Sequence, residues 1–138
     1  MHPRCLARCR IRAGRCRHLD DSLGALNCGT MGLESNHCMH YLLTYEYTDD
    51  YLEKRGQFRN EHLRHAWSAQ QRGELILAGA AGDPPDSAVF VFSCDSAAAI
   101  EAFVQADTYV INGLVRRHRI QPWTTVVGEM AHTPIRPE

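Results

Sequence analysis

The chain has 138 residues, of which 44% are hydrophobic and 8% aromatic, and its formal net charge is −1. This length is enough for one domain with a single core. No run of about 18 apolar residues occurs, so the sequence predicts no membrane-spanning helix. The near-zero charge gives no reason to expect a nucleic-acid partner.

The first 38 residues differ from the rest in charge and in cysteine content. They contain six arginines against three acidic residues, and five of the six cysteines: Cys5, Cys9, Cys16, Cys28 and Cys38. The cysteine spacing lacks the close C-x-x-C pairs of a zinc site. Arginines interrupt the apolar core that a secretory signal needs, so a disulfide scaffold would lack its secretory context.

Two further interpretations of residues 1–38 stay open. The segment is rich in arginine and lacks acidic residues over its first nineteen positions, which is typical of a mitochondrial presequence. It also shows no helical or strand periodicity, and Met31 and Met39 both offer later starts. We therefore expect a disordered or non-native extension on a cytoplasmic protein, and we look for function in residues 39–138.

Residues 40–47 mix β-branched, aromatic and leucine side chains, which predicts a strand. Thr48 or Asp49 is expected to cap a helix that ends near Gly73. Residues at spacings of three or four form a stripe along one face of this helix. They are Tyr51, Arg55, Phe58, His62, Ala66 and Ala69.

Two strands are predicted next, at residues 74–81 and 88–94, and the turn GDPPDS between them indicates a hairpin. Ser96 is expected to cap a helix over residues 97–106. Residues 107–113 then read as a polar turn that ends in Gly113. The last strand, within residues 114–128, is expected to be interrupted at Pro122, because proline cannot donate to a sheet ladder.

This order of elements, β-α-β-β-α-β, predicts an α+β, ferredoxin-like fold with an antiparallel four-stranded sheet. Helices cover one face of such a sheet, so the other face needs a cover of its own. A symmetric homodimer that packs sheet on sheet would provide it. We expect the domain to span residues 39–128 and residues 129–138 to form a C-terminal tail.

His62 is the main candidate for chemistry, because histidine is suited to general acid or base catalysis near neutral pH. Its alternative is a core histidine bonded to the backbone. Asp107 ends the second predicted helix, where the dipole disfavours a carboxylate by roughly 0.3–1 kcal/mol, so helix stability does not explain it. Asp107 either caps the next segment or reaches His62 and orients the imidazole.

Arg59 and Tyr109 are candidate substrate-binding residues. Arg59 shares the face of His62 and either extends into solvent or binds an anionic or enolate oxygen. Tyr109 either donates a hydrogen bond in the turn after Asp107 or packs. We expect no metal, since no third ligand accompanies His62 and His65, and no cofactor, since no P-loop or G-x-G-x-x-G motif occurs. Structural or surface positions are expected for His40, His65, His118 and Cys94.

Five segments together resemble the YciI-like family. They are MHYLLTYEYTDDYLEKR at residues 39–55, the R-x-x-H-L of Arg59 to Leu63, RGELILAGA at 72–80, ADTYVINGLV at 106–115 and IQPW at 120–123. The resemblance covers about residues 39–128 and none of the first 38. Each motif is weak alone, but their order and spacing together are fairly specific.

The resemblance implies a dimeric α+β barrel with a His–Asp pair at a pocket, which falls on His62 and Asp107. Thr108 stands where family members usually have proline, and its loss loosens the turn that aims the aspartate. A few relatives act on chlorinated hydroquinone-type aromatics, and similar barrels isomerise muconolactones. We expect a cofactor-independent dehydrochlorinase, isomerase or lyase acting on a small cyclic substrate. The alternative is a non-catalytic ligand-binding or stress-related dimer.

Overall fold

The structure is a computed structural model that describes residues 38–138. Its elements are β1 (Met39–Tyr47), α1 (Tyr51–Gln71), β2 (Leu75–Gly82), β3 (Pro85–Cys94), α2 (Ala97–Ala106), α3 (Thr108–Ile111) and β4 (Val115–Pro122). The expectations for the arginine-rich segment, with four of its cysteines and Met31, lie outside the described residues. No helix in the described part of the chain is long and apolar enough to cross a membrane.

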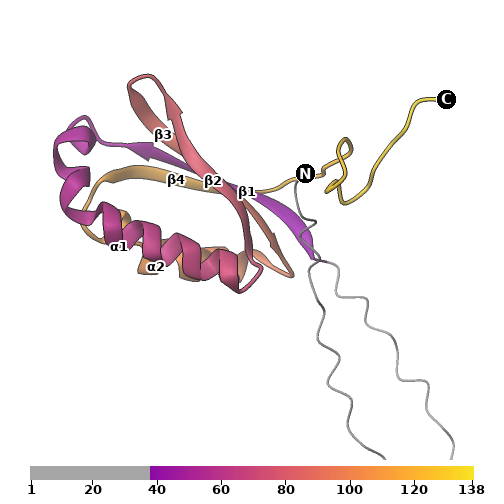
Figure 1. Cartoon of the computed structure of the whole chain (residues 1–138), viewed down its shortest axis with the longest axis horizontal. Coiled ribbons are helices and arrows are strands. Elements are labelled where there is room, and N and C mark those ends of the chain that lie inside the picture. The colour runs from indigo at the N-terminus through magenta and orange to yellow at the C-terminus, as the bar shows by residue number, and fades with distance from the viewer. Residues whose placement is uncertain (1–37) are drawn as a thin grey trace, which may run out of the picture. The chain divides into compact units, whose positions relative to one another are not determined.

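The four strands form one antiparallel sheet in the order β2-β3-β1-β4. β1 is central and pairs with β3 on one side and β4 on the other. β2 and β3 form the predicted hairpin. The helices α1 and α2 lie together on one side of the sheet (Figure 1). The α+β, ferredoxin-like fold predicted from the sequence is therefore confirmed.

The core lies between the sheet and the helices. Side chains alternate between the two faces of a strand, and every second residue of β1 and β3 is buried on the helix side. These residues are Tyr41, Leu43, Tyr45, Tyr47, Ala88, Phe90, Phe92 and Cys94. From α2, the predicted inward residues Ile100, Phe103 and Val104 complete the layer. Several aromatic side chains of the sheet thus lie on the face that α1 covers.

The start of α1 differs from the prediction. Asp50 occupies the position before the first helical residue, and neither Thr48 nor Asp49 does. The Thr48 hydroxyl instead donates a hydrogen bond to the Asp50 carboxylate at 2.6 Å, and the Asp50 side chain makes no capping hydrogen bond to the helix. The predicted end is confirmed, since Gly73 follows the helix with a φ of 82°, a conformation that favours glycine.

Residues 107–113 were predicted to be a turn, and this prediction is wrong in part. Thr108–Ile111 forms the short helix α3, because the Asp107 carboxylate accepts a hydrogen bond from the backbone N–H of Tyr109 at 3.0 Å. Four helical residues are too few to show a 3.6-residue period. The inference that helix stability does not explain Asp107 is also wrong, since Asp107 caps the start of α3 as well as ending α2.

The last strand is shorter than predicted, because β4 ends at Pro122. The chain nevertheless stays close to β1 for one more residue, as the N–H of Trp123 donates to the carbonyl of His40 at 2.8 Å. Beyond it, the N–H groups of Thr133 and Ile135 donate to the carbonyls of Thr125 and Val126. Part of the segment predicted as a tail is thus hydrogen-bonded to the residues that follow β4.

Candidate active site

His62 of α1 and Asp107, at the junction of α2 and α3, form a buried pair. The Nδ1 atom of His62 lies 2.8 Å from Oδ1 of Asp107. The Asp107 side chain is fully buried and the His62 side chain is 10% exposed. The predicted contact between the two residues is therefore present, although they are 45 positions apart in the sequence.

Asp107 is held by two further donors besides His62. The hydroxyl of Tyr45, in β1, donates to Oδ2 at 3.0 Å, and the N–H of Tyr109 donates to Oδ1 at 3.0 Å. A carboxylate can only accept hydrogen bonds. The hydrogen of a neutral His62 imidazole therefore lies on Nδ1, and the lone pair lies on Nε2.

The Nε2 atom of His62 is the free end of this arrangement. It makes no hydrogen bond within residues 38–138. No buried side-chain nitrogen or oxygen in that range lacks a partner, so Nε2 is not sealed inside the core. His62 also lines a cavity, and the unprotonated nitrogen is therefore available to a molecule bound there.

Aromatic rings fix the plane of the imidazole. The ring of Tyr109 stacks on His62 with centroids 4.0 Å apart and planes 8° from parallel. Phe90 of β3 contacts the imidazole edge-on, with centroids 6.2 Å apart. The sequence left two roles open for the Tyr109 side chain, a hydrogen-bond donor or a packing residue, and the structure shows it packed on His62. Its role in substrate binding stays a prediction, although Tyr109 lines the same cavity.

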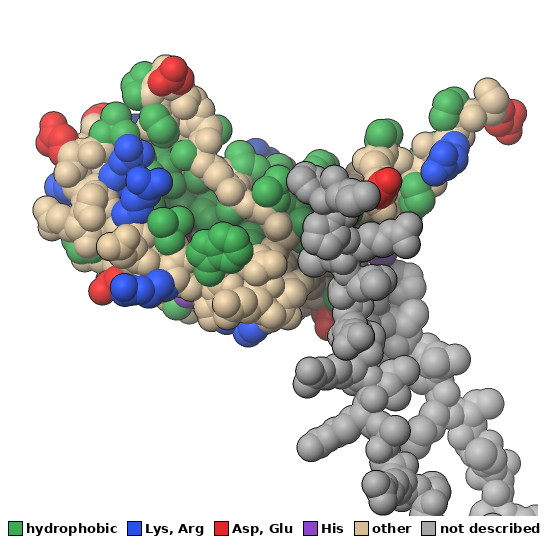
Figure 2. All heavy atoms as spheres, viewed as in Figure 1, with side chains coloured by type: hydrophobic (Ala, Val, Ile, Leu, Met, Phe, Trp, Pro, Cys, Tyr) green, Lys and Arg blue, Asp and Glu red, His purple; other side chains and the backbone are tan. Residues whose placement is uncertain are grey.

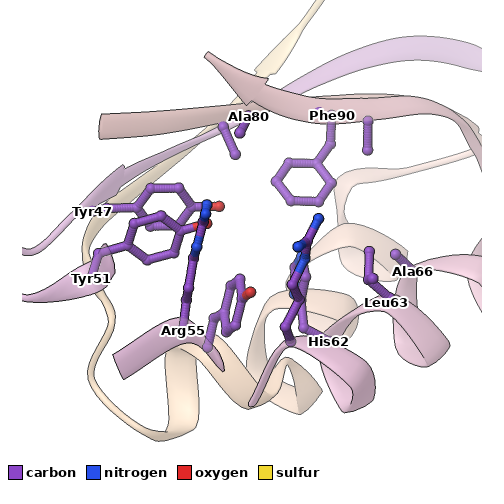
Figure 3. Close-up of a pocket in the computed structure, with 13 residues that line it drawn as sticks. Tyr47, Tyr51, Arg55, His62, Leu63, Ala66, Ala80 and Phe90 are labelled. Carbon is purple, nitrogen blue, oxygen red and sulfur yellow. The ribbon is translucent and has the colours of Figure 1, made fainter. Parts of the chain in front are cut away.

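The cavity encloses about 200 Å³ between α1 and the strands β2 and β3. Apolar side chains line a hollow between the sheet and the helices, and basic side chains gather at one side of it (Figure 2). In the close-up, Arg55 and His62 extend from α1 toward the strands, and the rings of Tyr47 and Tyr51 lie beside Arg55 (Figure 3). Arg59 also lines the cavity, and its role in substrate binding stays a prediction.

Sequence reasoning missed four residues of this site: Tyr45, Tyr47, Tyr51 and Arg55. Tyr51 and Arg55 were placed on the stripe of α1 but were given no role there. Tyr45 and Tyr47 follow the alternation of β1, which predicts burial and nothing more. A run of tyrosines facing a core next to a histidine could have indicated a polar site, because a buried hydroxyl needs a hydrogen-bond partner.

Three tyrosines of the site, Tyr45, Tyr47 and Tyr109, have pKa values raised above the ordinary range. Burial, and then the neighbouring Asp107 carboxylate, raises the pKa of Tyr45. Burial, and then Tyr51, raises the pKa of Tyr47. Burial, and then Tyr51, also raises the pKa of Tyr109 to about 12, although the positive charges of Arg59 and Arg55 offset part of this effect. Neutral hydroxyls therefore surround the His–Asp pair.

These raised pKa values predict a loss of stability at high pH. The unfolded chain releases tyrosine protons near pH 10, whereas folded Tyr45 keeps its proton. The free energy of unfolding should therefore fall above pH 10 by about 1.4 kcal/mol per pH unit for Tyr45 alone. Urea unfolding between pH 8 and 11 tests this expectation. Tyr45→Phe should show a shallower alkaline fall, and an equal slope in both proteins would contradict it.

Structural or surface positions are occupied by His40, His65, His118 and Cys94, as predicted. His65 bonds the carbonyl of Phe103 through Nε2 at 2.9 Å. Nδ1 of His40 lies 2.8 Å from Oγ1 of Thr125, while His118 is exposed and Cys94 is buried. Within residues 38–138, no group of three or more His, Cys, Asp or Glu side chains could hold a metal ion.

Comparisons with known proteins identify a family and a similar fold for this chain. A comparison with curated protein sequences found no match. Among solved structures, the chain is similar to 5-chloro-2-hydroxyhydroquinone dehydrochlorinase from Burkholderia phenoliruptrix in complex with 2,5-dihydroxybenzoquinone, with a TM-score of 0.55 and 16% sequence identity. The likeness covers 63% of this chain and 95% of that one. The sequence model of the YCII-related domain matches residues 39–124, more than half of the chain. The protein therefore belongs to the YCII-related domain family.

Proposed function

We propose that this protein is a small enzyme that moves a proton on a cyclic substrate, with His62 as the general base. One observation carries the proposal: Nδ1 of His62 is bonded to the buried carboxylate of Asp107, while Nε2 is left free at a cavity. A buried histidine that served only the core would satisfy its polar atoms within the core. Asp107 orients the imidazole and stabilises the imidazolium that forms.

The reaction begins when a carbon next to a carbonyl, or the hydroxyl of an enol, gives its proton to Nε2 of His62. The electron pair of the broken bond is delocalised into an enolate, whose oxygen is stabilised by Arg59 or by a backbone N–H. In an elimination, the enolate reforms the carbonyl and expels a leaving group such as chloride, and the imidazolium releases its proton to water. In an isomerisation, the imidazolium returns the proton to another carbon. Neither route changes the number of electrons overall, so no redox cofactor is required.

Chloride release tests this function. The fold is shared with a dehydrochlorinase whose structure holds a hydroxyquinone, and this likeness supports substrates of that kind. We expect the protein to release chloride from 5-chloro-2-hydroxyhydroquinone or from a related chlorinated hydroxyquinone, including compounds that bear a carboxylate, followed with an ion-selective electrode. A second assay follows the isomerisation of unsaturated lactones by ultraviolet absorbance. No turnover in either panel above that of buffer would contradict the proposal.

A non-catalytic ligand-binding role uses the same cavity and predicts a different pattern. A ligand that binds only the folded state raises the midpoint of thermal unfolding. For a binding protein, 2,5-dihydroxybenzoquinone should stabilise the wild type and His62→Ala alike, without turnover of any compound. For an enzyme, stabilisation is accompanied by turnover, and the turnover is lost in His62→Ala.

We also propose that a second copy of the chain covers the open face of the sheet. Leu42, Val91 and Leu77 lie in one row across three paired strands, on the face opposite the buried core, and Leu77 is 69% exposed. Exposed apolar rows of this kind mark interfaces, and a two-fold axis would pair the row with itself.

The dimer is tested by light scattering after size exclusion. The wild type should have the mass of two chains, and Val91→Glu should have the mass of one, because a buried, unpaired carboxylate is costly at an interface. Gln57→Glu, on the exposed face of α1, adds the same charge in the helical layer and should remain dimeric. A monomeric wild type, or an unchanged Val91→Glu, would refute this assignment.

A further inference from the structure

Arg55 and Arg59 of α1 bring two uncompensated positive charges to the cavity. Both line it, and no acidic side chain among the described residues does. Neither arginine forms an ion pair within residues 38–138. Elsewhere in that range, basic side chains do pair with acids, namely Lys54, Arg72, Arg116 and Arg117. The two arginines at the cavity are therefore available for an anion that comes from outside the chain.

The aromatic residues beside these arginines position Arg55. Its guanidinium lies 5.7 Å from the centroid of the Tyr51 ring, within the range of a cation–π contact. Tyr51 in turn stacks on Tyr47, with centroids 3.6 Å apart and planes 3° from parallel. The cation–π contact with Tyr51 thus stabilises the guanidinium of Arg55, and its positive charge is not neutralised by this contact.

The spacing along α1 sets the distance from the arginines to the candidate base. Arg59 precedes His62 by three residues and Arg55 precedes it by seven. At 1.5 Å per residue, these intervals correspond to about 4.5 Å and about 10 Å along the helix axis. All three side chains line the same cavity. A single six-membered ring with an anionic substituent is long enough to extend from the arginines to His62.

We propose that the substrate is a cyclic compound that bears a carboxylate, with the carboxylate held by Arg55 and Arg59 and the ring presented to Nε2 of His62. This inference rests on the proposed proton transfer and names its substrate class. A guanidinium binds the two oxygens of a carboxylate through a matching fork of N–H donors. The small apolar wall formed by Ala80, Ala88 and Phe90 contacts the ring and leaves little room beyond it.

Binding of two matched probes tests the proposal independently of turnover. The probes are 2,5-dihydroxybenzoate and hydroquinone, which differ in the carboxylate, and both are measured by isothermal titration calorimetry. The wild type should bind the carboxylate at least about tenfold more tightly. Arg55→Gln and Arg59→Gln should each weaken its binding by about tenfold and change hydroquinone binding by less than about twofold. Arg55→Lys should recover only part of the loss, because it restores the charge without the fork.

Arg64→Gln is the matched control, since Arg64 is exposed on the same helix and does not line the cavity. It should bind both probes as the wild type does. Equal affinity of the wild type for the two probes, or equal losses in Arg64→Gln and Arg59→Gln, would overturn the inference. So would tighter binding of phenyl phosphate than of benzoate, which would assign the arginines to phosphate.

The two proposals can fail separately. His62→Gln should keep its affinity for 2,5-dihydroxybenzoate, because the arginines remain in place. Arginine-dependent binding without any His62-dependent turnover would overturn the proposed function and leave the anion site standing. His62-dependent turnover of neutral rings, with carboxylate-bearing rings turned over no better and no change in Arg55→Gln, would overturn the carboxylate inference alone.

Discussion

His62→Gln should lower kcat/KM for any substrate of this protein by about 10²–10⁴-fold, the contribution typical of a positioned general base. The fold should survive, because a glutamine amide can still donate a hydrogen bond toward Asp107 and because α1 tolerates glutamine well. The rate of product formation gives kcat/KM. Far-ultraviolet circular dichroism and urea unfolding show whether the fold and its stability are retained.

The matched control for this variant is His65→Gln, one turn further along α1. His65 bonds the carbonyl of Phe103 and stacks on its ring with centroids 4.3 Å apart, and it does not line the cavity. It should lose stability without losing kcat/KM. Equal losses of activity in His62→Gln and His65→Gln would show that α1 packing, rather than proton transfer, governs the rate.

Asp107→Ala should be the most destabilising single change at the site. It removes the acceptor from three donors at once: the His62 imidazole, the Tyr45 hydroxyl and the backbone N–H of Tyr109. Leaving a buried group without its partner costs about 1–3 kcal/mol for each group. Because such costs are not additive, we expect a total of about 3–5 kcal/mol, measured from urea unfolding curves.

Asp107→Asn separates stability from catalysis. The amide oxygen can accept from His62 and from the Tyr109 N–H, and the amide nitrogen can donate to the Tyr45 hydroxyl. The fold should therefore lose less than in Asp107→Ala, while kcat/KM falls by about 10²-fold or more, because an uncharged amide cannot stabilise the imidazolium. An Asn variant with wild-type kcat/KM would mean that Asp107 is a structural cap only.

The fold followed from local patterns, whereas much of the site did not. The alternation in β1 and the stripe of α1 predicted which faces are buried, and they placed His62 inward. The bond between Tyr45 and Asp107 spans 62 residues, and no local pattern reports a contact of that length. The pairing of His62 with Asp107 was predicted chiefly because the chain resembles a family that has such a pair.

The position of Asp107 is misjudged from the sequence alone. At the end of the predicted second helix a carboxylate is poorly placed, which favours a functional role over a structural one. The structure shows that it also begins α3, a helix too short to leave a periodic pattern. Capping and the bond to His62 share the same oxygen, so the structural and functional interpretations of Asp107 are compatible. Arg55 was overlooked because an unpaired charge is recognised only when its neighbours in space are known.

The most direct test of the central claim is the tautomer of His62, measured by ¹⁵N NMR of the imidazole nitrogens. The imidazole signals that are missing from the spectrum of His62→Gln are those of His62, which assigns them. In the neutral imidazole, the hydrogen should lie on Nδ1, toward Asp107, and the bare Nε2 should shift when 2,5-dihydroxybenzoate is added. A neutral imidazole with its hydrogen on Nε2 in the free protein would contradict the assignment of His62 as the base.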